Sequence, residues 1–251
     1  MATITLITGA SRGLGRETAL SVARSGGDVI ATYRGNAGQA RTLVAEVEAL
    51  GRKAVALQLD TADTAAFPDF VARVRRALHD TWQRDRFDHL VNNAGHGVHA
   101  TIEETTPEQF DQLVAVHFKG VFFLTQALLP LLADGGRIVN ISSGLTRFAL
   151  PGHAAYAAAK TAVETFTRYL AKELGPRGIT ANVVAPGAIE TDFSGGVVRD
   201  DPELNGRIAA STALGRAGVP QDIGPMIAAL LGDANRWVNA QRIEASGGQS
   251  L

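Results

Sequence analysis

Three residues in the second half of the chain, Ser143, Tyr156 and Lys160, have the types and spacing to move a proton at a carbonyl oxygen. A tyrosine with the ordinary pKa of about 10 is a poor proton donor or acceptor near neutrality. Lys160 follows Tyr156 by four residues, so both lie on one helix face, and its charge would lower the pKa of Tyr156. The Ser143 hydroxyl could hydrogen-bond the same substrate oxygen. The group predicts acid–base chemistry while a cofactor moves hydride to carbon. The alternative is a helix-surface pair without a catalytic role.

A glycine-rich turn near the N-terminus predicts a dinucleotide site. It reads Thr8-Gly9-Ala10-Ser11-Arg12-Gly13-Leu14-Gly15, after the apolar run Ile4–Thr8 and before an amphipathic helix. Glycines permit a tight turn and close approach of phosphate, and the helix N-terminus supplies free N–H groups and a positive dipole. The predicted contacts are Gly9, Ser11, Arg12, Gly13, Leu14 and Gly15. A glycine turn without a ligand is the alternative.

The choice between NAD and NADP is made at the end of the second predicted strand. An acidic residue there would bind the ribose 2′-hydroxyl of NAD, but this chain has Tyr33 followed by Arg34. Arg12 lies inside the glycine turn as well. Arginine pairs with phosphate through bidentate, charge-assisted hydrogen bonds, so these residues favour the 2′-phosphate of NADP(H). The alternative is that both arginines are ordinary surface charges.

Short apolar runs alternate with helix-length amphipathic segments along the chain. The predicted strands are Thr3–Thr8, Val29–Tyr33, Ala54–Leu59, His89–Asn92, Arg137–Ser142, Thr180–Ala185 and Arg242–Ala245. The predicted helices are Leu14–Ser25, Ala37–Leu50, Phe67–Asp80, Pro107–Leu132, Ala155–Glu173 and Pro220–Leu231. This alternation predicts one doubly wound, Rossmann-like α/β domain over residues 1–251, with about seven parallel strands and helices on both faces.

Composition narrows the class of protein. The chain has 251 residues, 45% of them hydrophobic, a net charge of −1 and no cysteine. Disulfides and thiolate metal sites are therefore excluded, and no nucleic-acid partner is expected. We see no signal peptide and no apolar run long enough to span a bilayer, so we expect a cytoplasmic protein without a membrane partner.

The order of further motifs resembles the short-chain dehydrogenase/reductase family over essentially the whole chain. Besides the glycine turn and the Tyr156–Lys160 pair, the matching segments are Asp60, Asn92–Gly95, Ile138–Ser143, Asn182–Gly187, Leu214–Arg216 and Ser246–Gly248.

The resemblance implies roles for individual residues. Tyr156 would be the general acid in reduction and the base in oxidation, Lys160 would also bind the nicotinamide ribose, and Ser143 would position the substrate oxygen. Ser142 should point the other way if its strand persists. The implied cofactor contacts, besides Tyr33, Arg34, Tyr156 and Lys160, are Asp60, Thr61, Asn93, Ala94, Gly95, Pro186, Gly187, Ile189 and Thr191.

Two positions depart from the family pattern. His117 stands where the family usually has the Asn of a proton relay, and we consider a relay role and a purely structural role equally. Ala240 stands where a Gly is common, which we interpret as a minor packing change. His96, His99 and His153 also lie near motif residues, but their spacing does not favour a metal, and we predict no metal site.

We therefore expect an NADPH-dependent oxidoreductase that reduces a ketone or other carbonyl reversibly, acting on a free small molecule. The alternatives are a 3-oxoacyl-acyl carrier protein reductase, for which Arg177 is retained, and a non-catalytic NADP(H)-binding regulator. The resemblance also implies a homo-oligomer, a dimer or tetramer. The long segment from residue 188 to 212 looks irregular, and we interpret it as a lid over the substrate.

Overall fold

The apolar runs of the chain become strands that are buried on both faces of one parallel sheet. The computed structural model describes residues 2–251; Met1, the first residue of the predicted domain, lies outside the described residues. The strands are β1 (Ile4–Ile7), β2 (Asp28–Tyr33), β3 (Ala54–Gln58), β4 (Phe87–Asn92), β5 (Leu132–Ile141), β6 (Thr180–Pro186) and β7 (Arg242–Ala245). All neighbours pair in parallel in the order β3-β2-β1-β4-β5-β6-β7. The prediction of a doubly wound sheet of about seven strands is confirmed.

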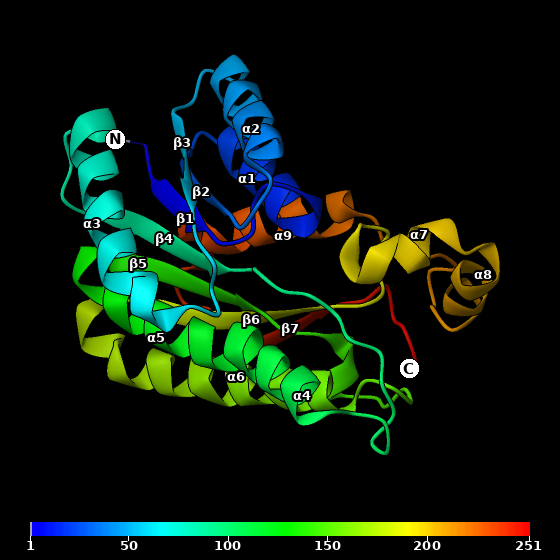
Figure 1. The fold of residues 1–251 in the computed structure, drawn as a ribbon. Helices are drawn as coiled ribbons and strands as arrows, with labels where there is room; N and C mark the ends of the chain where they lie inside the picture. The colour runs from blue at the N-terminus through cyan, green and yellow to red at the C-terminus, as the bar shows by residue number, and fades with distance from the viewer. Residues whose placement is uncertain (1) are drawn as a thin grey trace.

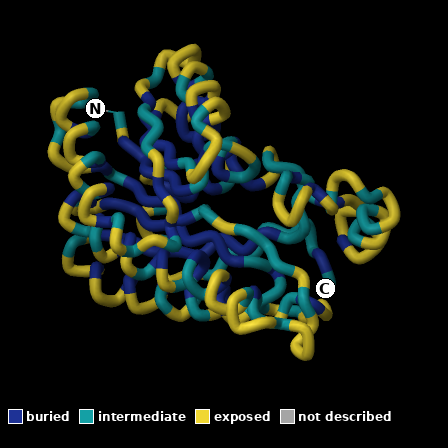
Figure 2. Tube along the Cα trace, in the orientation of Figure 1, coloured by how far each residue is buried: buried dark blue, intermediate teal, exposed yellow. Residues whose placement is uncertain are grey.

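Helices cover both faces of the sheet (Figure 1). The α-helices of the described chain are α1 (Gly13–Arg24), α2 (Ala37–Ala49), α3 (Phe67–Ala77), α4 (Pro107–Val114), α5 (Gly120–Leu128), α6 (Ala154–Glu173), α7 (Val197–Asp200), α8 (Pro202–Ala210) and α9 (Pro220–Leu231). Of these, α7 and α8 project beyond the edge of the sheet (Figure 1). Apolar side chains of α1, α2 and α9 form the core on one face, and those of α3, α5 and α6 form the core on the other. Figure 2 shows the buried strands between these two layers.

The strand order reverses between β1 and β4, and the turns that follow these two strands lie side by side. The Thr8 hydroxyl accepts the backbone N–H groups of Asn93 and Ala94, each at 2.9 Å. A Cβ on Gly9 would lie 2.9 Å from Cα of Ala94, so only glycine fits there. Because ligands of open α/β sheets bind at such a reversal, this edge is where the fold positions a site.

Two predicted segments are wrong in detail. The predicted helix Pro107–Leu132 is α4, then a π-helical turn at Ala115–Lys119, then α5 and a 3-10 turn, and β5 already begins at Leu132. The segment 188–212, expected to be irregular, contains α7 and α8, and Asp201 caps α8 by accepting the N–H groups of Glu203 and Leu204. Asp is a favoured N-cap residue, and our interpretation of the segment as irregular, from its Gly, Asp and Pro content, overlooked this signal.

The prediction that no apolar stretch could span a bilayer also needs correction. The helical stretch Pro107–Leu131 has 25 residues and a mean hydropathy of 1.5, which is long and apolar enough by length and composition. Its buried side chains, including Leu124 and Leu128, belong to the core beside α3 and α6. Core helices pass the same test, so this stretch is weak evidence for a membrane span.

Ala240 affects the backbone rather than the packing. Its φ is +59°, in the left-handed region that costs an alanine roughly 1–2 kcal/mol. Its side chain is exposed. The expected minor packing change is therefore a local backbone strain just before β7.

Candidate active site

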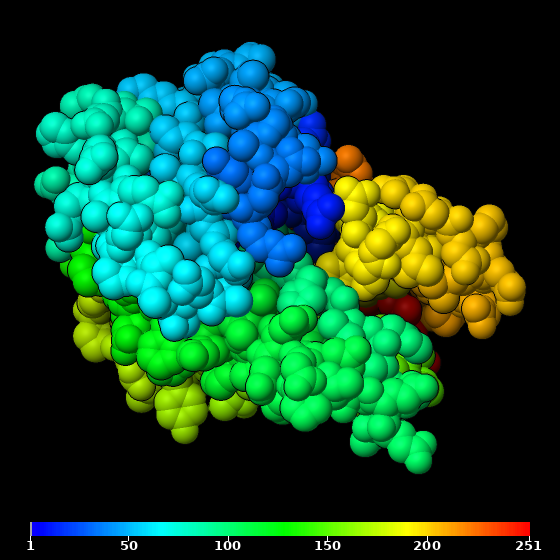
Figure 3. Space-filling view, viewed as in Figure 1, coloured from blue at the N-terminus to red at the C-terminus, as the bar shows by residue number. Residues whose placement is uncertain are grey.

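A cleft opens at the carboxyl edge of the sheet, between the α7–α8 segment and the loop after β4 (Figure 3). The predicted catalytic residues come from two elements at this edge. Ser143 lies two residues beyond the end of β5, and Tyr156 and Lys160 lie on the first two turns of α6. Ser143 lies close enough to the Tyr156 side chain to favour its ionised form. Lys160 Nζ lies 5.7 Å from the centre of the Tyr156 ring and donates to the Ile141 carbonyl at 2.8 Å.

The expectation that Lys160 lowers the pKa of Tyr156 is wrong for this structure. Burial raises the pKa of Tyr156 to about 12, and Ser143 opposes this rise only in part. Burial also lowers the pKa of Lys160 to about 8. Burial is the largest cause of the pKa shift of each side chain, and Tyr156 therefore holds its proton at neutral pH.

His117 packs against Tyr156 from the π-helical turn. Its side chain is fully buried, its ring lies edge-on to Tyr156 with 5.0 Å between ring centres, and its Nε2 is 2.6 Å from the His96 carbonyl. Nε2 must carry the proton to make that bond, which leaves Nδ1 as a buried acceptor without a partner among residues 2–251. Burial and the Lys160 charge lower the pKa of His117 to about 2. His117 is therefore neutral, and π turns of this kind often occur at functional sites.

The predicted glycine turn has the features needed to hold a pyrophosphate. Arg12 precedes α1 without a side-chain cap, and the first turn of α1 has no acidic residue. Its N–H groups are therefore free for an anion. A Cβ on Gly15 would lie 2.5 Å from Nδ2 of Asn93, and one on Gly13 would lie 3.6 Å from Cβ of Thr191. The glycine turn thus contacts the segments predicted to bind the ribose and the nicotinamide.

The residues predicted to select NADP(H) lie beside this turn. Arg12 and Arg34 are exposed, and within residues 2–251 neither guanidinium forms a salt bridge. Tyr33 is half-buried at the end of β2. Asp60 is exposed and accepts the Ala62 N–H at 2.9 Å, while Thr61 is buried. Burial lowers the pKa of His96, and the charges of Arg34 and Lys160 lower it further while that of Asp60 opposes them.

The segment predicted to hold the nicotinamide is fixed by the C-terminal part of the chain. Pro186 ends β6, and the next two backbone N–H groups donate to the Ala245 carbonyl at 3.2 Å and to the Gln249 side chain at 2.9 Å. Ile189 forms a bridge with Gly218. Gln249 is a site residue that our sequence analysis did not find, because no local pattern links it to residue 188.

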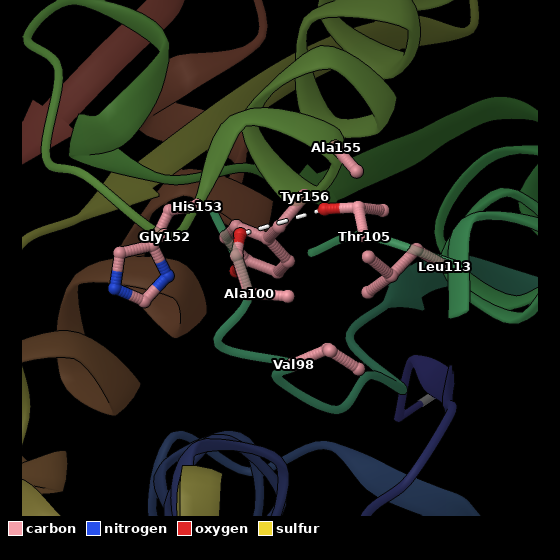
Figure 4. Close-up of a pocket in the computed structure, with 8 residues that line it drawn as sticks. All are labelled: Val98, Ala100, Thr105, Leu113, Gly152, His153, Ala155 and Tyr156. Carbon is pink, nitrogen blue, oxygen red and sulfur yellow. Dashed lines mark hydrogen bonds between the residues drawn. The ribbon is translucent and has the colours of Figure 1, made fainter. Parts of the chain in front are cut away.

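Apolar and polar side chains lie around the Tyr156 ring (Figure 4). A small pocket beside the ring is lined by Val98, Ala100, Thr105, Leu113, Gly152, His153 and Ala155. Phe193, at the start of the predicted lid, lies 6.0 Å from the Tyr156 ring between ring centres and is 42% exposed. Apolar and aromatic side chains therefore lie next to Tyr156, together with the polar side chains of Thr105 and His153.

Two further histidines, His99 and His153, form a pair. The rings of His99 and His153 meet edge-on with 5.2 Å between centres, and burial lowers the pKa of His153. Over residues 2–251 no group of three or more His, Cys, Asp or Glu side chains could hold a metal ion.

Known proteins resemble this chain over nearly its whole length. A family model described as enoyl-(acyl carrier protein) reductase matches residues 9–250. Tetrahydroxynaphthalene reductase PfmaG of Pestalotiopsis fici is 36% identical over 256 residues, covering 98% of this chain and 90% of that protein.

Three solved structures extend the similarity to the fold. The promiscuous reductase LugOII, which catalyses keto-reduction at C1 during lugdunomycin biosynthesis, has a TM-score of 0.94 and 39% identity, covering 99% of this chain and 98% of its own. The angucycline C-6 ketoreductase LanV with bound NADP has a TM-score of 0.94 and 33% identity, covering 99% and 95%. A short-chain dehydrogenase/reductase from Serratia marcescens has a TM-score of 0.91 and 32% identity, covering 99% and 98%. The predicted cofactor, NADP(H), is confirmed by these comparisons. The chain therefore belongs to the short-chain dehydrogenase/reductase family, as predicted, and is an oxidoreductase.

Proposed function

We propose that this protein is an NADPH-dependent ketoreductase in which Tyr156 protonates the substrate oxygen. The observation that carries the proposal is the buried Tyr156 phenol, with Ser143 and Lys160 beside it, at the sheet edge that holds the glycine turn. Bound NADPH supplies the hydride. The similar ketoreductases LugOII and LanV support this reaction class.

Tyr156, Ser143 and Lys160 have separate roles in the proposed proton transfer. Tyr156 keeps its proton until a ketone oxygen arrives, because burial holds the pKa of its phenol near 12. Negative charge that develops on the substrate oxygen would then draw the proton, and Ser143 can hydrogen-bond the same oxygen. Lys160 stabilises the phenolate left behind. Oxidation of the alcohol would run these steps backwards, with the phenolate as base.

The similar reductases support a ring-bearing ketone as substrate. In this chain Val98, Leu113 and Phe193 are apolar residues near Tyr156, and the polar Thr105 and His153 lie beside them. PfmaG is a tetrahydroxynaphthalene reductase, and LanV has been solved with NADP and rabelomycin. We propose a free ketone of aromatic polycyclic character, reduced in the cytoplasm.

The carrier-protein alternative has less support. Arg177, the basic residue retained for an acidic carrier protein, pairs with Asp134 at 2.8 Å and donates to the carbonyls of Leu129 and Leu132. It thus closes a turn of this chain instead of facing outwards. The non-catalytic alternative is disfavoured because Tyr156, Lys160 and Ser143 are all present and in contact.

The test is a carbonyl panel followed by NADPH absorbance, with aromatic polycyclic ketones, simple ketones, a 3-oxoacyl thioester and an enoyl thioester. We expect turnover of polycyclic ketones, and Tyr156→Phe should lower kcat about 10²- to 10⁴-fold while NADPH binding stays nearly intact. NADPH binding without turnover of any carbonyl would support the regulator instead. A kcat for Tyr156→Phe near that of the wild type would show that another group is the acid.

A further inference from the structure

A half-buried ion pair lies beside Ser143. Arg242 of β7 places its Nε 2.9 Å from Oε1 of Glu164 on α6, and the two side chains are 27% and 12% exposed. Glu164 follows Lys160 by four residues, as Lys160 follows Tyr156, so all three lie along one ridge of the helix. The helix that carries the proposed acid therefore also carries this carboxylate.

One carboxylate oxygen of this pair holds both sides of the Ser143 turn. Oε1 of Glu164 accepts the hydroxyl of Ser142 at 2.6 Å and that of Thr146 at 2.8 Å. Arg242 Nη2 donates to the carbonyl of Ser143 itself at 3.3 Å and to the Thr146 hydroxyl at 2.9 Å. One ion pair thus hydrogen-bonds Ser142, Thr146 and the carbonyl of Ser143.

These bonds leave the Ser143 hydroxyl free for the reacting oxygen. Ser143 Oγ accepts the backbone N–H of Leu145 at 3.2 Å, which directs its own proton elsewhere. Ser143 opposes, in part, the rise in the pKa of Tyr156 that burial causes. A shift of the turn would therefore change both the position of Ser143 and the proton affinity of Tyr156.

The charges around Arg242 alternate and are balanced. Arg242 Nη1 also donates to Glu244 at 3.0 Å, and Glu244 accepts both Nε and Nη2 of Arg147 at 2.8 and 2.7 Å. The hydrogen bond from Arg147 is the main cause that lowers the pKa of Glu244 to about 2, so this carboxylate stays ionised. Arg147 further donates to the carbonyls of Gln249 and Ser250.

We propose that Glu164 and Arg242 are positioning residues for Ser143 in the ketone reduction. They hold the 142–146 turn between α6 and β7, so that the Ser143 hydroxyl meets the Tyr156 phenol where the substrate oxygen binds. The assignment rests on the proposed function for its kinetic consequences but not for the Ser143–Tyr156 contact itself.

The kinetic test is a double-mutant cycle between Arg242→Met and Ser143→Ala. Arg242→Met should lower kcat about ten- to hundredfold, because a displacement of roughly 1 Å at a reacting group can cost about a hundredfold. If Arg242 acts through Ser143, adding Arg242→Met to Ser143→Ala should lower kcat no further. Arg242→Lys keeps the charge and should recover part of the rate, and the NADPH dissociation constant should stay unchanged in all three. Multiplicative losses in the double variant would overturn the proposal.

A second readout needs no turnover. The chain has three tyrosines, so ¹³Cζ-tyrosine NMR assigns Tyr156 by comparison with Tyr156→Phe. Arg242→Met and Glu164→Leu should both move the Tyr156 resonance towards its position in Ser143→Ala. An unmoved resonance in folded Arg242→Met would overturn the proposal, whether or not the wild type reduces any ketone. Failure of every ketone in the panel, with this resonance shifted, would instead reject only the proposed function.

Arg52→Met is the matched control. Arg52 is also 27% exposed and pairs with a buried carboxylate, Asp28, at 2.7 Å. Asp28 begins β2, so this pair lies at the amino edge of the sheet, away from Ser143. The substitution should lower the melting temperature but leave kcat and the Tyr156 resonance unchanged. If Arg52→Met and Arg242→Met changed kcat and the Tyr156 resonance equally, Arg242 would contribute only to the general stability of the fold.

Discussion

At the level of single residues, burial fixes the protonation state with which the proposed reaction begins. Tyr156, whose pKa is about 12, is protonated at neutral pH and can donate this proton. Lys160, whose pKa is about 8, remains largely charged at neutral pH. Ketone reduction needs this combination, a proton to give and a positive charge beside the phenolate that forms. The same burial disfavours Tyr156 as a base in the free protein, so oxidation should require a higher pH than reduction.

Arg34 should decide between the two nicotinamide cofactors. It is exposed at the end of β2, without a salt bridge in the described chain, and so is available to a 2′-phosphate. Arg34→Ala should weaken NADPH roughly ten- to hundredfold, since a hydrogen bond to a charged group contributes about 1.5–3 kcal/mol. NADH affinity should hardly change. Fluorescence titrations with both cofactors measure this, and equal losses for NADPH and NADH would contradict the assignment.

His117 should act as a neutral packing residue, and its burial should make the folded protein less stable at acidic pH. Its pKa is about 2 in the folded protein and near the ordinary 6.5 when unfolded, so the unfolded chain binds the extra proton as pH falls below 6.5. Folding stability is therefore lost on acidification, and His117→Asn should make the melting temperature fall less between pH 6.5 and 4.

The same substitution tests the relay. A neutral His117 cannot add a limb to the pH profile of kcat between pH 5 and 9, so His117→Asn should leave the shape of that profile unchanged. Disappearance of a limb in the variant would establish proton transfer through His117.

At the level of elements, the sequence predicts what local patterns encode. The period of apolar residues predicted the strands, and the glycine turn and the Tyr156–Lys160 spacing predicted where a site should lie. The π turn that holds His117 was not predictable, because Pro107–Leu131 is apolar overall and a shift of its apolar stripe by one residue is hard to recognise in such a segment. The Glu164–Arg242 contact joins residues 78 positions apart, so no local pattern marks it, although the four-residue step from Lys160 to Glu164 was visible.

The α7–α8 segment should close over the substrate. Three consecutive residues before α7, Ser194, Gly195 and Gly196, have φ values of +52°, +76° and +83°, which makes a backbone hinge available there. Hydrogen exchange in residues 188–212 should be fast in the free protein and slow with NADPH and ketone bound. High protection in the free enzyme that ligands leave unchanged would rule out a lid.

Within this segment, Phe193 should contact the ketone. Phe193→Ala should raise the KM for the ketone more than the dissociation constant of NADPH, because the ring lies beside Tyr156 and not beside the glycine turn. Phe110→Ala on α4, 47% exposed against 42% for Phe193, is the control and should change neither constant.

At the level of the whole molecule, alternation of strands and helices predicts a parallel sheet but does not order its strands. That order places the ends of β1, β4, β5 and β6 along one edge and so assembles the site from segments more than a hundred residues apart. Burial of Tyr156, and with it the reversal of the expected pKa shift, is likewise a property of the assembled layers. Sequence analysis could predict the candidate catalytic residues but not the burial that sets their pKa values.

The surface outside the cleft should assemble copies of this chain. Phe123 on α5 and Tyr169 on α6 are 41% and 63% exposed, and Trp237, shortly before the edge strand β7, is 95% exposed. Large apolar groups and an open sheet edge are typical of interfaces, and closed symmetry is the usual outcome. We predict a dimer or tetramer of the 26.4 kDa chain, measurable by light scattering at micromolar concentration. One surface contains Phe123 and Tyr169, and the other contains Trp237 near β7. In a tetramer that uses both surfaces, Tyr169→Asp or Trp237→Asp alone should leave dimers, and the two substitutions together should leave monomers. A wild-type protein that scatters as a monomer would refute the prediction, and a dimer broken by one substitution alone would identify the surface that pairs.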